Sequence, residues 1–165
     1  MKVILKFITA STLFFSVLCI GTEVHDHKSR EVTSPLIPKV AVNLFRDEMD
    51  GVNVHIELQN YVLNAPTQEN ISRLKTEGGM TLGHAHLFIN GVKHQRIYAQ
   101  HFHISEKWLK KGVNQIAISL NSHQHENWQH NNQTIVGTVF FDLNAPQLVL
   151  HEFTSQPLEN THNHH

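Results

Sequence analysis

Apolar residues alternate with polar residues over short segments throughout the middle of this chain. In residues 52–59 the apolar positions are Val52, Val54, Ile56 and Leu58. A period of two places these side chains on one face of an extended strand, as in an antiparallel sheet with one buried face. A helix needs a period near 3.6, which no long segment shows. The pattern therefore restricts the chain to an all-β fold.

Similar segments recur and are bounded by turn residues. Asn90-Gly91 is the strongest hairpin signal, because this dipeptide favours the tight turn that joins two antiparallel strands. About seven or eight short strands in a chain of 165 residues predict one antiparallel β-sandwich domain. We place this domain at residues 40–153 and leave open whether 147–153 adds an edge strand. The clearest expected strands are 40–44, 52–58, 84–89, 92–98, 116–120 and 135–143.

The two ends of the chain differ from this domain. Residues 1–21 contain two lysines, then an apolar run, then a small residue, which is the order of a secretory signal peptide. The run is short for a membrane span, so we expect no transmembrane segment in a mature, periplasmic or secreted protein. A lipid anchor at Cys19 is the less favoured alternative. We expect a flexible lead-in over 22–39 and a disordered, histidine-containing tail over 154–165.

Histidine is the unusual component, at 15 of 165 residues. Lysine and arginine total 13 against 14 acidic residues, so the charge argues against nucleic-acid binding. Cleavage of the signal would remove the single cysteine, which leaves histidine, methionine, carboxylates or asparagine to hold a metal. The histidine excess indicates metal chemistry or a response to pH.

The sharpest histidine pattern is His84-Ala85-His86. Residues i and i+2 of a strand point to the same face, about 6.5–7 Å apart. Two imidazoles at this spacing can converge on one ion, because each needs a bond of only about 2.0–2.1 Å. The alternative is two solvent-facing histidines on an ordinary strand.

Two further pairs repeat this spacing. We expect His103 and His125 to complete the ligand set begun by the first pair, with His101 and His123 as secondary candidates. Loops at strand ends commonly supply such ligands on a rigid scaffold. Met80 is a further secondary candidate as a thioether ligand for Cu(I), although a core methionine is the alternative.

The register of the hairpin after Ile89 is ambiguous. A direct two-residue turn would place both His94 and Arg96 on the apolar face of the sheet. Because Arg96 does not fit an apolar face, a register shift or a β-bulge remains an alternative.

Several of these segments also carry a family resemblance, because the chain reads GHAHLFING, RIY, FH and LN at 83–91, 96–98, 102–103 and 120–121. Over residues 40–143 this resembles a largely uncharacterised family of small exported bacterial proteins, whose recurring text is close to GHAHLYVNG, RLYGPWFH and LNTNDH. The chain departs from the family text by adding histidines at 101 and 123. The resemblance implies an immunoglobulin-like or cupredoxin-like sandwich and, by analogy with periplasmic copper carriers, metal binding. The family histidines map onto His84, His86, His103 and His125.

These observations lead to a main hypothesis and two alternatives. The main hypothesis is a non-enzymatic metal-binding protein, with copper first and zinc second, that sequesters the ion or delivers it to a periplasmic acceptor. A cupin-like metalloenzyme is one alternative, because Gly78 followed by His84-Ala85-His86 resembles the opening of the first cupin motif. The motif's glutamate is missing, and Glu126 is the carboxylate best placed for catalysis. The other alternative is an interaction module with pH-responsive histidines.

Overall fold

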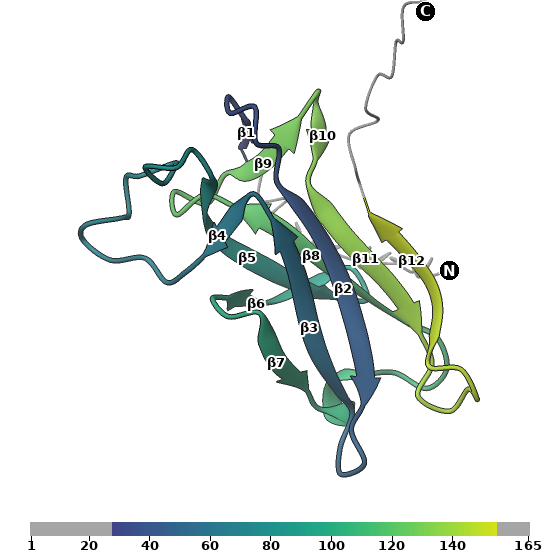
Figure 1. The fold of residues 1–165 in the computed structure, drawn as a ribbon. Helices are drawn as coiled ribbons and strands as arrows, with labels where there is room; N and C mark the ends of the chain where they lie inside the picture. The colour runs from purple at the N-terminus through teal and green to yellow at the C-terminus, as the bar shows by residue number, and fades with distance from the viewer. Residues whose placement is uncertain (1–27, 155–165) are drawn as a thin grey trace, which may run out of the picture.

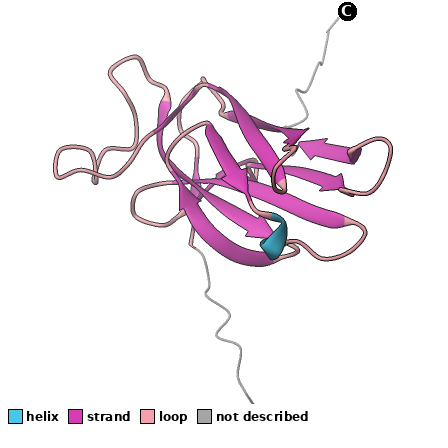
Figure 2. Cartoon of the chain, turned by 90° about the horizontal axis from the view of Figure 1, so that it is seen from below, coloured by secondary structure: helices cyan, strands magenta, loops and turns pink. Residues whose placement is uncertain are grey.

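The computed structural model describes residues 28–154, which form a β-sandwich (Figure 1). Strands make up nearly all of its regular structure, and Figure 2 shows the short helical turn η1 (Glu106–Trp108). In this part of the chain, no helix has the length and apolar character needed to cross a membrane. The described strands are β1 (Ser29–Glu31), β2 (Lys39–Arg46), β3 (Val52–Gln59), β4 (Tyr61–Leu63), β5 (Thr81–Ile89), β6 (Val92–Ile97), β7 (His101–Ile104), β8 (Asn114–Asn121), β9 (Asn127–His130), β10 (Gln133–Thr134), β11 (Val136–Phe141) and β12 (Val149–Thr154).

The strands are divided between two sheets of unequal size. In the nine-stranded sheet β8 is central, with β5 along one side and β11 along the other. Strands β4 and β6 pair with β5, β12 pairs with β11, and β9 continues from the end of β8 to β1 and β10. The smaller sheet has the order β2-β3-β7. Nearly all pairs are antiparallel, and the exceptions described are β1 with β9 and β4 with β5.

The core lies between the sheets and is formed by the alternating positions. Val54 and Ile56 of β3 face Leu87, Ile118 and Val139 of the larger sheet, and each of the five is at most 2% exposed. Burying one such side chain contributes about 1.5–3 kcal/mol, so this alternation stabilises the sandwich. The predicted all-β sandwich is confirmed.

The structure differs from the sequence-based prediction in the number of strands and in the flexible lead-in. The described residues contain twelve strands rather than seven or eight. The strands that sequence reading missed have two to four residues, as in β1, β4, β9 and β10, which is too short to show a period. Part of the expected lead-in is also ordered, because β1 pairs with β9 and Val32 is 6% exposed in the core.

The hairpin between β5 and β6 contains a β-bulge. Asn90 and Gly91 both have positive φ, at 50° and 82°, as the predicted tight turn requires. Pairing then shifts by one residue, so that His86 rather than Ala85 lies opposite Arg96 across the strands. The direct register is therefore wrong, and the bulge is the alternative that holds. It keeps a guanidinium off the core face, where burying an unpaired charge is costly.

The chain changes sheets immediately after this hairpin. Ile97 ends β6 in the core at 3% exposed, and β7 then pairs with β3 in the smaller sheet. The crossing is fixed by a hydrogen bond of 2.8 Å from the Ile56 amide to the Gln100 carbonyl. His101 and His103 therefore belong to a different layer from the histidines of β5 (Figure 1).

Candidate metal centre

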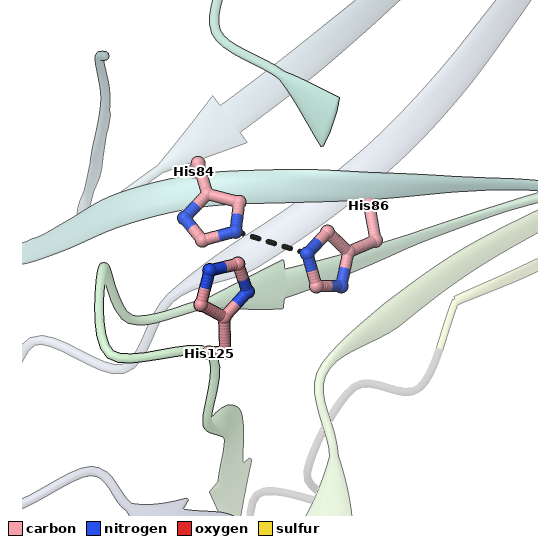
Figure 3. A group of neighbouring side chains, drawn as sticks. All are labelled: His84, His86 and His125. Carbon is pink, nitrogen blue, oxygen red and sulfur yellow. Dashed lines mark hydrogen bonds between the residues drawn. The ribbon is translucent and has the colours of Figure 1, made fainter. Parts of the chain in front are cut away.

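Two histidines of β5 face each other on the outer side of the larger sheet. The apolar residues of β5, such as Leu87, point into the sandwich, so His84 and His86 share the opposite face. Their Nε2 atoms lie 3.0 Å apart (Figure 3). Two nitrogens bound to one tetrahedral ion lie about 3.4 Å apart, given bonds of about 2.0–2.1 Å. The pair is therefore close to the spacing of a chelate.

A third imidazole approaches this pair from the turn between β8 and β9. The His125 ring centroid lies 5.2 Å from that of His84 and 5.8 Å from that of His86. One ligand nitrogen from each of the three residues lies within 4.8 Å of the others. Figure 3 shows the three rings converging from β5 and from the turn. This group of three histidines, which we call the histidine triad, is able to hold a metal ion.

The turn that carries His125 is closed by its own backbone. The Ser122 amide donates to the Glu126 carbonyl at 2.9 Å, and the His125 amide donates to the Ser122 carbonyl at 3.0 Å. His125 has a φ of 66°, which is uncommon for a residue other than glycine. Its side chain is partly exposed, whereas the two strand histidines are at most 1% exposed. The triad therefore has a buried side and a solvent-facing side.

A buried tyrosine holds the strands beneath the triad together. The Tyr61 hydroxyl lies 2.7 Å from the His84 carbonyl and 2.9 Å from the Asn121 carbonyl, so one donor serves two neighbouring strands. Burial raises the pKa of Tyr61 well above its usual value of 10, so the hydroxyl stays protonated and remains a donor. This contact fixes the backbone from which His84 projects. Nothing in the sequence pattern singles out Tyr61.

His123 lies beside the triad without joining it. Its ring is stacked against that of His84, with centroids 5.7 Å apart and 8° between the planes. Its Nε2 lies 3.0 Å from the Asn64 side-chain oxygen, which accepts a hydrogen bond from the ring. Burial lowers the pKa of His123, so a neutral ring covers one side of His84. Sequence reading selected His123, but nothing pointed to Asn64.

The electrostatics of the site favour neutral imidazoles. The pKa of His84 is lowered to about 3, first by burial and then by charge on neighbouring histidines, Arg96 and Lys93. A ring in this state is neutral at physiological pH, which is the form that binds a metal.

The carboxylate that follows His125 is already occupied. Arg30 of β1 donates to both oxygens of Glu126, with Nη2 at 2.9 Å from Oε1. The Ser122 hydroxyl also donates to Glu126, and the pKa of this carboxyl is lowered chiefly by the bond to Arg30. Glu126, which the sequence suggested as a catalytic acid–base residue, is therefore a carboxylate paired with Arg30.

The remaining predicted ligands lie away from the triad. His103 is on the outer face of the smaller sheet, where its ring nitrogens are 3.2 Å from Asn53 Oδ1 and 3.5 Å from Asp50 Oδ2. His101 stacks on His55 of β3, with ring centroids 4.3 Å apart. The expected set of four histidines does not come together, because the chain changes sheets after β6. His103, together with His101, lies on β7 of the smaller sheet. Met80 precedes β5, and about 13 Å of extended chain separates it from His84.

The Asp47–Asp50 turn beside His103 provides a test of pH dependence. The pKa of Asp47 is lowered from its usual 3.8 by hydrogen bonds from the Met49 amide and the Asn53 side chain. A carboxyl with a lowered folded-state pKa adds stability above pH about 4, and this is lost as the pH falls through the folded pKa. We expect Asp47→Asn to flatten the acid limb of a plot of unfolding free energy against pH, measured by urea unfolding between pH 6 and 2. The exposed Glu152→Gln is the control, and an unaltered acid limb in Asp47→Asn contradicts the assignment.

Comparison with family models, curated proteins and solved structures finds no match to this chain.

Proposed function

We propose that this protein is an exported transition-metal carrier that sequesters or delivers copper, with zinc as the second choice, through the histidine triad. The observation that carries the proposal is the convergence of His84, His86 and His125 to within 4.8 Å with two of them buried. Imidazole nitrogen suits both copper and zinc. Burial of His84 and His86 around a common point disfavours the alternative of ordinary solvent-facing histidines.

Export and the family assignment are part of the same proposal. Support for export comes from the signal-like order of residues 1–21, which lie outside the described part of the chain. Support for the family comes from the GHAHLFING text of β5, which supplies two members of the triad. We propose membership of the small exported bacterial proteins that this text resembles.

We propose a carrier rather than an enzyme. A hydrolytic metal site needs a carboxylate or another base near the bound water. Glu126 is the nearest carboxylate in sequence to the triad, and both its oxygens accept hydrogen bonds from Arg30. The exposed side of the triad at His125 suits transfer of an ion to an acceptor protein.

Metal titration of the purified chain tests the proposal. We expect one tight equivalent of Cu(I) in the wild type and its loss in His84→Asn/His86→Asn, measured by competition with a chromophoric chelator. The matched control is His55→Asn/His101→Asn, which removes two stacked histidines from the smaller sheet. The terminal histidines are the same in all three chains and contribute a constant background. Tight binding that is unchanged in the first variant contradicts the proposed site.

A further inference from the structure

We infer that the histidine triad selects a monovalent ion, Cu(I), over Zn(II) and other divalent ions. This inference rests on the proposed metal-binding function and adds the charge of the ion. It follows from four features of the site: its donors, its burial, its charged neighbours and the outer nitrogen of His84.

The donors carry no charge. The triad consists of three imidazoles, and each binds a metal in its neutral form. The neighbouring positions on β8 are also neutral, because Asn121 pairs with His84 and Ser119 pairs with His86. Glu126 is neutralised by Arg30. A bound Cu(I) therefore leaves the site with one net positive charge, and a bound Zn(II) leaves it with two.

Burial of the site increases the energetic effect of this difference in charge. His84 and His86 are 1% and 0% exposed, so an ion held between their Nε2 atoms loses most of its hydration on that side. The cost of transferring a charge into a medium of low polarity grows with the square of that charge. The penalty therefore falls much more heavily on a divalent ion than on a monovalent one.

Two basic side chains of β6 add to this penalty. The bulge in β6 places Arg96 across from His86, and Lys93 lies across from Phe88. Residues directly opposite each other share a face of the sheet, so Arg96 and Lys93 lie on the same face as His86 and Phe88. Repulsion is proportional to the charge of the bound ion, so it disfavours Zn(II) twice as strongly as Cu(I).

The outer nitrogen of His84 lacks the support that divalent sites commonly provide. A histidine that binds a metal usually donates its second ring N–H to a carboxylate or carbonyl, which makes the ligand more basic. Nδ1 of His84 is buried and has no hydrogen-bond partner among residues 28–154. His84 is therefore a weaker donor, which suits an ion of lower charge.

Affinities for Cu(I) and Zn(II) measured on the same chain test the inference. Cu(I) is titrated anaerobically against bicinchoninate and Zn(II) against a fluorescent indicator. Only binding that His84→Asn/His86→Asn abolishes is counted, which removes the contribution of the terminal histidines. We expect Cu(I) to bind the wild type at least about 100-fold more tightly than Zn(II), given the charge penalties on a buried dication.

Reversal of the neighbouring charge provides the specific control. Arg96→Glu is expected to reduce the Cu(I)-to-Zn(II) affinity ratio about tenfold, a moderate effect because Arg96 is exposed and screened by solvent. Lys111→Glu makes the same charge change on an exposed loop residue and is expected to leave the ratio unchanged. The potential of the bound Cu(II)/Cu(I) couple is expected to be lower in Arg96→Glu than in the wild type.

The possible outcomes separate the two proposals. Zn(II) binding as tight as Cu(I) in the wild type overturns the selectivity and leaves the carrier function standing. An unchanged ratio in Arg96→Glu overturns the contribution of the neighbouring charge to that selectivity. If no tight binding of either metal depends on His84 and His86, the carrier function itself fails.

Discussion

We expect Gly83→Ala to lower the free energy of unfolding by about 3 kcal/mol, the upper part of the range for overpacking a well-packed interior. A methyl group at Gly83 would lie 2.0 Å from the Asn121 carbonyl oxygen and 2.6 Å from the Tyr61 hydroxyl. The first of these atoms is backbone of the central strand β8, so it cannot move aside as a flexible side chain does. The strands must separate, and the support for His84 is lost with them.

Urea unfolding of the wild type and Gly83→Ala measures this effect. Gly78→Ala is the matched control, because its nearest neighbour would be Thr76 Oγ1 at 3.8 Å and its backbone does not need a positive φ. We expect the control to keep wild-type stability. Equal unfolding midpoints for the two alanine variants would show that β5 and β8 do not approach as closely as described.

The second large effect is expected in the rate of metal release. His125→Asn should accelerate dissociation of the bound ion about 100-fold or more. Losing only a group that hydrogen-bonds to a metal ligand already costs about 10–100-fold in metal affinity, and here the ligand itself is lost. Asparagine tolerates the φ of 66° at this position, so the turn is kept while the imidazole is lost. The unfolding free energy of the metal-free chain should therefore remain close to that of the wild type.

Stopped-flow transfer of Cu(I) to an excess of chelator measures this rate. His101→Asn is the control, because it removes an exposed histidine from the smaller sheet without changing the triad. A release rate in His125→Asn equal to that of the control would exclude His125 as a ligand. Faster release together with a large loss of stability would instead indicate a role in folding the turn.

Sequence reading predicted the sandwich because a period of two specifies which side chains share a face. It placed the apolar stripe of β3 correctly and identified His84, His86 and His125, which the structure brings together. It failed for His103, because periodicity does not say which sheet a strand joins. That choice depends on the crossing after Ile97, where the core accepts an apolar side chain and β3 offers a free edge to pair with β7.

The residues around the triad were harder to foresee for a similar reason. Tyr61 and Asn64 reach the site from a strand and its following loop, which are about twenty residues from β5 in sequence. Their roles depend on the parallel pairing of β4 with β5, and a three-residue strand gives no periodic signal. Arg96 differs, because its poor fit to the apolar face already indicated an irregular hairpin.

The bulge between β5 and β6 accommodates one extra residue without changing which side chains face the core. Two residues of β6, Lys93 and Gln95, pair with consecutive residues of β5, so His94 is the extra residue. Deleting His94 would therefore leave a regular hairpin in which Arg96 still lies opposite His86 and Ile97 opposite Ala85. A relative that is one residue shorter at this point would keep the same distribution of charge on the two faces of the sheet. Alignments of this hairpin should accordingly allow a gap of one residue at position 94.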